Sequence, residues 1–83
     1  MIGSVVAVNP TRGMVALETD DGYSIIEMLG DDPPELGDRI RWQGTTPLGG
    51  ETVENLTQRC TYDVFFQNHH VSRALLRQQL LLD

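Results

Sequence analysis

The 83-residue chain contains no lysine, and its six basic residues, all arginines, are outnumbered by twelve acidic residues. The resulting formal net charge of −6 repels DNA and RNA, unless the arginines cluster on one face of the molecule. Residues 1–57 hold ten of the acids and three of the arginines, so the acidity belongs to the first two-thirds of the chain.

Cysteine and long apolar runs are also scarce. The single cysteine, Cys60, cannot form an internal disulfide, which indicates a reducing compartment, and we expect a cytoplasmic protein. The first apolar run, residues 2–8, is short, alternates and has no preceding basic region, which favours a strand over a signal peptide. No apolar stretch approaches the ~20 residues of a membrane-spanning helix, so we expect no membrane partner.

What is present is a repeated alternation of apolar and polar residues, in a chain too short to build two separate cores. Asp21-Gly22 is the dipeptide that best accepts a tight hairpin turn. Short strands at intervals of roughly 8 to 12 residues indicate a small all-β barrel or sandwich. Five strands are predicted, at residues 2–8, 12–19, 23–29, 39–43 and 52–58.

The chain continues beyond this predicted barrel of residues 1–58. Residues 59–83 are predicted to be a C-terminal extension, with a short extended segment at 61–66 followed by an α-helix at 68–82. In that helix Val71, Leu75 and Leu82 share one stripe, with Leu76 and Leu80 beside it. So apolar a segment must be buried, either on its own barrel or against a second subunit or a partner protein.

Three short motifs lie on the first three strands: "GSVVAVN" at residues 3–9, "RGMVAL" at 12–17 and "SIIEM" at 24–28. In these motifs and in the later "GDRIRW" and "ENL", the chain resembles the cold-shock domain over about residues 2–57. The resemblance implies an OB-fold, a mainly β five-stranded barrel that binds single-stranded RNA or DNA. Residues that match the family are Gly3, Val5, Asn9, Arg12 and Gly13.

The residues that the family uses for binding are replaced here. Its exposed stacking residues correspond to Ala7, Met14, Ala16, Ile25 and Glu27. Inward positions remain apolar: Val5, Val15, Leu17, Ile26, Ile40, Trp42, Val53 and Leu56. Because base stacking on aromatics contributes about 1 to 3 kcal/mol per base, we expect weak and salt-dependent binding at most.

The candidate nucleic-acid-binding residues are Arg12, Met14, Tyr23, Arg39 and Arg41. The arginines would contact phosphates, Tyr23 would stack on a base, and Met14 would offer an adaptable apolar contact. The alternative interpretation is that the arginines pair with nearby carboxylates, such as Glu54 across a strand, and that Tyr23 merely flanks a turn.

Two groups of residues contain side chains that can bind metals, but neither has the spacing or the number of ligands of a metal site. The acidic loop at residues 31–35 does not have the spacing of a calcium loop. Cys60, His69 and His70 supply three of the four ligands that zinc needs, and two of them are adjacent. No nucleophile motif or phosphate-binding glycine loop accompanies them.

We therefore expect no metal, no cofactor and no enzyme activity. The sequence favours a non-enzymatic, cold-shock-like binding module with at most weak affinity for single-stranded RNA or DNA. The alternative is a protein–protein interaction or self-association domain. It would bind a protein partner or form a homodimer through Val71, Leu75 and Leu82 of the C-terminal helix.

Overall fold

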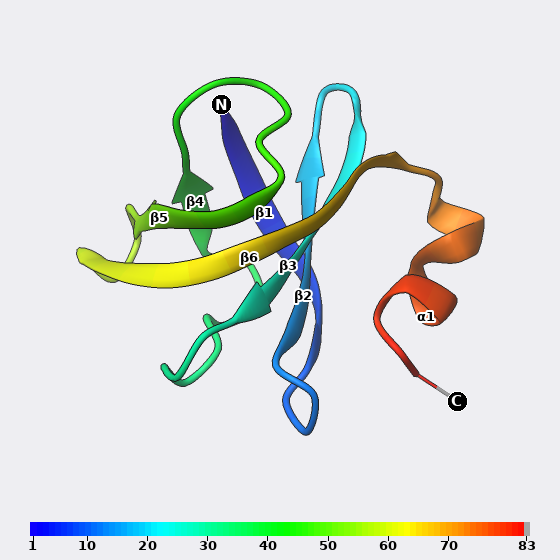
Figure 1. The fold of residues 1–83 in the computed structure, drawn as a ribbon, viewed down its shortest axis with the longest axis horizontal. Coiled ribbons are helices and arrows are strands. Elements are labelled where there is room, and N and C mark those ends of the chain that lie inside the picture. Colours follow the sequence, from blue (N-terminus) through cyan, green and yellow to red (C-terminus); the bar gives the residue numbers. More distant parts are fainter. Residues whose placement is uncertain (83) are drawn as a thin grey trace.

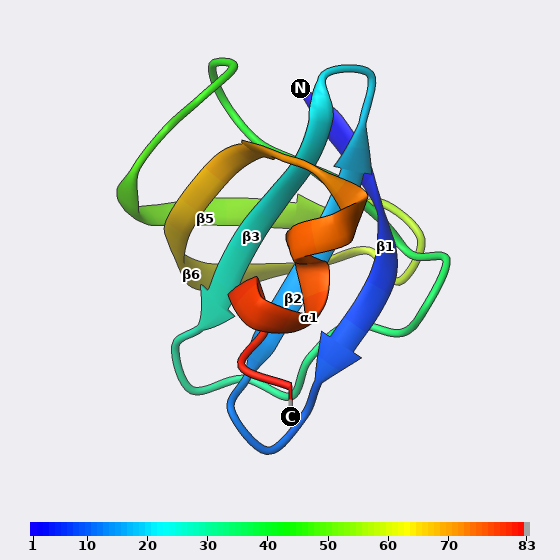
Figure 2. The same ribbon diagram turned by 90° about the vertical axis from the view of Figure 1, so that its right-hand side faces the viewer.

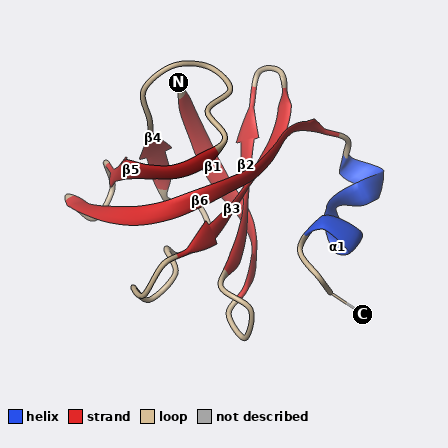
Figure 3. Cartoon of the chain, viewed as in Figure 1, coloured by secondary structure: helices blue, strands red, loops and turns tan. Residues whose placement is uncertain are grey.

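The computed structural model describes residues 1–82, which form a closed antiparallel barrel followed by a short helical segment (Figure 1, Figure 3). The strands are β1 (Ile2–Asn9), β2 (Met14–Thr19), β3 (Gly22–Met28), β4 (Arg39–Arg41), β5 (Gly49–Asn55) and β6 (Cys60–Val71). A 3₁₀ helix, η1 (Arg73–Leu75), and one turn of α-helix, α1 (Leu76–Gln79), follow them.

The strands follow one another around the barrel in the order β1-β2-β3-β6-β5-β4, and β4 closes onto β1. The predicted small β barrel is confirmed, but the predicted number of strands was wrong, because residues 1–82 contain six strands rather than five. The additional strand, β6, is the longest, and it joins β3 to β5. It sweeps across the front of the barrel in Figure 1.

The prediction of a helix over residues 68–82 was wrong at its beginning. Residues 68–71 continue β6, and the register of this strand against β3 shifts on either side of Ile25. His70 has a φ of 55°, so the backbone bends locally. This irregularity breaks the alternation of apolar residues that would have identified a strand, whereas the backbone pairing with β3 persists across it.

The helical segment is also shorter than predicted at its end. Ser72 is extended, and the helix ends by Leu80, after which Leu81 takes a left-handed φ of 60°. None of the helices within residues 1–82 is long and apolar enough to cross a membrane.

The barrel interior is filled by alternate residues of all six strands and by Trp42, the residue after β4. Trp42 is only 3% exposed and packs against Phe66 with ring centroids 5.4 Å apart. The predicted burial of Trp42 is therefore confirmed. The other predicted inward positions are also buried, except Leu56, which is partly exposed.

A buried polar network around Asp38 fastens the loop after β3 to the β5–β6 turn. Asp38 Oδ2 accepts hydrogen bonds from Asn55 Nδ2 at 2.9 Å, from Gln58 Nε2 at 2.6 Å and from the Glu35 amide at 3.0 Å. Asn55 Nδ2 also donates to the Tyr62 hydroxyl at 3.1 Å. Burial raises the pKa of Asp38, but these hydrogen bonds outweigh it and hold the pKa below the ordinary 3.8.

Candidate functional site

The outer side of β1, β2 and β3 is where the cold-shock resemblance places the nucleic-acid motifs. Met14, Ala16 and Ile25 point outward there, yet they are only 5%, 0% and 0% exposed. They form a second apolar cluster with Val71 and Leu80, separate from the barrel interior. We call this surface the covered face, and residues 72–82 that lie over it the tail. Figure 2 shows the tail lying across these strands.

The tail is held on the covered face by two leucines and a buried amide. Leu80 is fully buried, and the partly buried Leu76, one helical turn earlier, packs against the same cluster. Asn9, at the end of β1, is buried, and its Nδ2 donates to the carbonyl oxygens of Leu80 at 2.8 Å and Leu81 at 3.5 Å. Asn9 therefore satisfies carbonyl groups that a helix end leaves without partners.

The predicted interaction stripe is split between two environments. Val71 is buried in the covered face, but it belongs to β6 rather than to a helix. Leu75 and Leu82 are 46% and 36% exposed, so the expectation that they would be buried was wrong. Because the segment begins as a tighter 3₁₀ turn, the apolar residues that face the barrel are Leu76 and Leu80.

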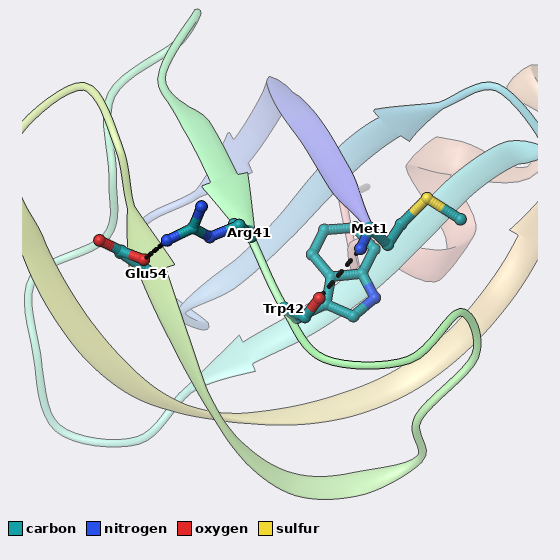
Figure 4. A network of polar contacts seen from close by, with 4 residues as sticks. All are labelled: Met1, Arg41, Trp42 and Glu54. Carbon is teal, nitrogen blue, oxygen red and sulfur yellow. Dashed lines mark hydrogen bonds and ion pairs between the residues drawn. The ribbon is translucent and has the colours of Figure 1, made fainter.

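Arg41 is paired with a carboxylate, as the alternative interpretation predicted. Its Nη2 lies 2.5 Å from Glu54 Oε1 on the neighbouring strand β5, and both side chains are about half exposed (Figure 4). Beside this pair, the Met1 amino group donates to the Trp42 carbonyl oxygen at 3.0 Å. The pair leaves the guanidinium of Arg41 partly neutralised.

The other two arginines lie far apart. Arg39 is opposite Ser4 near the beginning of β1, whereas Arg12 belongs to the turn after Asn9 at its other end. Asn9 comes five positions after Ser4 along β1, which corresponds to roughly 16 Å of strand. The three arginines therefore do not form one patch.

The other two candidates, Met14 and Tyr23, are also not exposed in a way that would let a base pack on them. Met14 is buried beneath the tail, and Tyr23 is partly buried at the edge of the same cluster. The Tyr23 hydroxyl donates to Glu18 Oε2 at 3.2 Å. A base approaching this ring would meet a carboxylate beside it.

Cys60 and the two histidines lie at opposite ends of β6. His69 Nδ1 is 2.8 Å from Ser24 Oγ, its Nε2 donates to the Pro47 carbonyl, and its ring stacks on Phe66. It fastens the β4–β5 loop to the barrel. In the part of the chain that the structure describes, no three His, Cys, Asp or Glu side chains gather as metal ligands would.

Sequence reasoning missed the part that Asn9 plays in the site. The sequence indicated Asn9 only as a match to the cold-shock family, directly after the first predicted strand. Two features of the sequence could have suggested it: an Asn at the end of a strand, and a C-terminal apolar segment with no glycine to end its helix.

Comparisons of the chain with protein-family models, with curated proteins and with solved structures find no match. An inference about function therefore depends on the geometry of the covered face and its surroundings.

Proposed function

We propose that the protein is a non-enzymatic, cold-shock-like OB-fold binding module that binds single-stranded RNA or DNA at most weakly. The observation that supports this most is the burial of Met14, Ala16 and Ile25 beneath the tail. OB-folds bind single strands by stacking bases on exposed side chains in a positively charged groove. Here the corresponding surface is apolar and is already covered by the tail. The aromatic ring at its edge, Tyr23, is partly buried.

The charges near this surface also disfavour a nucleic acid. Glu18 and Glu27 are the outward residues of β2 and β3 next to the covered face. Their hydrogen-bond donors, Tyr23 and Gln67, are uncharged. Arg41 is engaged by Glu54, so it offers a phosphate less than a free guanidinium would. The formal net charge of −6 repels phosphates, and the affinity of the few arginine–phosphate contacts that remain falls with added salt.

The test is a titration of the full chain with oligo(dT) and with oligo(U), followed through backbone amide shifts at low and at physiological salt. We expect a dissociation constant weaker than about micromolar at physiological salt, since neither stacking nor a cationic groove contributes. The variant Leu80→Asp places a carboxylate at the buried leucine and so disfavours docking of the tail. It is titrated in the same way for comparison with the unaltered chain. Tight binding by the unaltered chain, with shifts along β2 and β3, would contradict the proposal.

A second candidate function is protein interaction or self-association through the tail. The observation that favours it is that Leu75, Leu81 and Leu82 remain 46%, 52% and 36% exposed while the tail is docked. Sedimentation over a wide concentration range tests it, because a dimer doubles the mass and makes the melting temperature rise with concentration. A mass that stays monomeric throughout removes self-association.

A further inference from the structure

A second outer surface of the barrel, opposite in character to the covered face, spans β3, β6 and β5. Side chains alternate along a strand, so Phe65 and Asp63 of β6 point away from the core that Val64 and Phe66 enter. Phe65 is opposite Gly50 of β5, and Asp63 is opposite Thr52. We call the surface made by Leu29, Gly50, Thr52, Asp63 and Phe65 the open face.

Two large apolar side chains stand uncovered on this surface. Phe65 is 41% exposed and Leu29, which follows β3, is 50% exposed. The Leu29 amide donates to the Asp63 carbonyl at 3.1 Å, which places Leu29 diagonally across from Phe65. Diagonal neighbours on adjacent strands lie about 7 to 8 Å apart, close enough for one partner side chain to contact both.

Gly50 leaves the space beside Phe65 empty. A Cβ built at Gly50 would meet no atom within 4 Å, and one built at Gly49 would lie 3.9 Å from Phe65 Cε2, so the ring lies beside two residues of β5 that carry no side chain. An open groove of about 490 Å³ runs next to it, lined by Leu29, Gly50, Glu51, Thr52, Asp63 and Val64. The groove is shallow, so a partner side chain would meet open surface beside Gly50.

The charged residues around the open face are acidic. Asp63 lines the groove and Glu27 lies opposite Phe65 on β3, whereas Glu51 is opposite the inward Val64 and so belongs to the other side of β5. Asp63 accepts a hydrogen bond from Thr52 at 2.9 Å and Glu27 accepts one from Gln67 at 3.0 Å, and both donors are uncharged. Neither hydrogen bond brings a positive charge to the carboxylate, and no arginine lines the groove.

We propose that the open face binds a basic segment of a partner protein, in which an apolar side chain packs against Phe65 and Leu29. Lysine or arginine side chains on either side of that residue would pair with Asp63 and Glu27. Buried aromatic anchors surrounded by charges of one sign are typical of protein interfaces, where the charges select the partner and speed association. This inference goes beyond the proposed function, which concerns the covered face and the tail.

The chemistry of this surface argues against two other occupants. A nucleic acid would bring its phosphates against the carboxylates of Asp63 and Glu27. A second copy of the chain would bring a formal net charge of −6 to an acidic surface, and the chain has no lysine to offer. A cationic, partly apolar peptide is the occupant whose charge and hydrophobicity both fit.

The test uses a synthetic amidated peptide of alternating lysine and leucine, with a peptide of alternating glutamate and leucine as the charge control. We expect the lysine peptide to shift the amides of Gly50, Asp63 and Phe65, and the glutamate peptide to leave them unchanged. Phe65→Thr should weaken binding about tenfold or more, as expected for an aromatic anchor. Leu36→Thr is the matched control, since Leu36 is 69% exposed in the loop between β3 and β4, outside the strands of the open face.

The outcomes separate the proposal from nonspecific attraction. Shifts spread evenly over the acidic loops at residues 20–21 and 31–35 would overturn it, because the peptide would then follow charge alone. Equal losses for Phe65→Thr and Leu36→Thr would also overturn it. An unchanged affinity in Asp63→Asn would remove the electrostatic half of the argument, and with it the basic partner.

Discussion

The covered face and the open face are built from the same kind of strand, and β3 belongs to both. Its outward residue Ile25 is 0% exposed beneath the tail, whereas Leu29, which directly follows the strand, is 50% exposed. The difference lies in what covers each surface. On one face the chain supplies its own apolar partner, and on the other it leaves an aromatic ring beside a glycine. An outward apolar residue therefore does not by itself mark a binding surface.

The cover on the first face is small. It depends on one fully buried leucine, Leu80, on the partly buried Leu76, and on the hydrogen bonds from Asn9. Burying a leucine stabilises by about 1.5 to 3 kcal/mol, and part of this gain offsets the backbone entropy that is lost when the tail is ordered. The tail is thus the part of the chain expected to open most readily.

The largest effect is expected when the cover is removed. A chain that ends at Val71 retains all six strands but exposes Met14, Ala16 and Ile25 to water. We expect its unfolding free energy to fall by about 3 to 5 kcal/mol, which is a large part of the stability of so small a domain. Urea unfolding followed by Trp42 fluorescence measures this, and an unchanged midpoint would mean that the two faces do not differ as described.

A smaller effect is expected from single leucines of the tail. Leu80→Ala should destabilise the protein by about 2 to 3 kcal/mol, because it empties a fully buried site. Leu75→Ala makes the same chemical change five residues earlier at a side chain that is 46% exposed, and it should cost less than about 0.5 kcal/mol. Thermal melts of both variants decide, and equal losses would show that the tail packs through a different stripe.

The sequence predicted the inward residues of the barrel better than the extent of β6, the strand that joins β3 to β5. Alternation placed Val15, Leu17 and Trp42 inside correctly, because a period of two on a half-buried strand leaves little choice of register. It identified only residues 61–66 of β6, because the shifted register near His70 interrupts the alternation and the following leucines favour a helix. Pairing across the barrel, which no local pattern contains, decides where β6 ends.

The candidate site was predictable in its location but not in its state. The replacement of stacking residues by Met14, Ala16 and Ile25 indicated that this face had lost its platform, and packing by the tail was an open alternative. Which leucines would pack depended on the 3₁₀ turn at η1, whose geometry has no clear sequence signal. The open face was missed, because Phe65 reads as one more residue of an alternating strand.

A third prediction concerns the barrel beneath both faces. Because the folded-state pKa of Asp38 lies below 3.8, its carboxylate stabilises the fold above the unfolded-state value and this contribution is lost as the pH falls below about 4. Asp38→Asn should be about 1 to 2 kcal/mol less stable at neutral pH, since one hydrogen-bond donor would face another. Its stability should also fall less between pH 5 and pH 3 than that of the unaltered protein. Equal acid slopes, measured by urea unfolding, would show that other carboxylates dominate.

The smallest effect is expected on the open face, and there a small effect is informative. Phe65→Thr keeps a residue suited to a strand and removes a ring that is 41% exposed, so the unfolding free energy should change by less than about 0.5 kcal/mol. The same kind of change on the covered face, Ile25→Thr, should cost about 2 to 3 kcal/mol, because it removes buried apolar atoms and buries a hydroxyl. Stability alone then gives no reason for an aromatic residue at position 65, which leaves binding as its physical use. A loss for Phe65→Thr as large as that for Ile25→Thr would instead make Phe65 part of the packed structure, and the two faces would cease to differ.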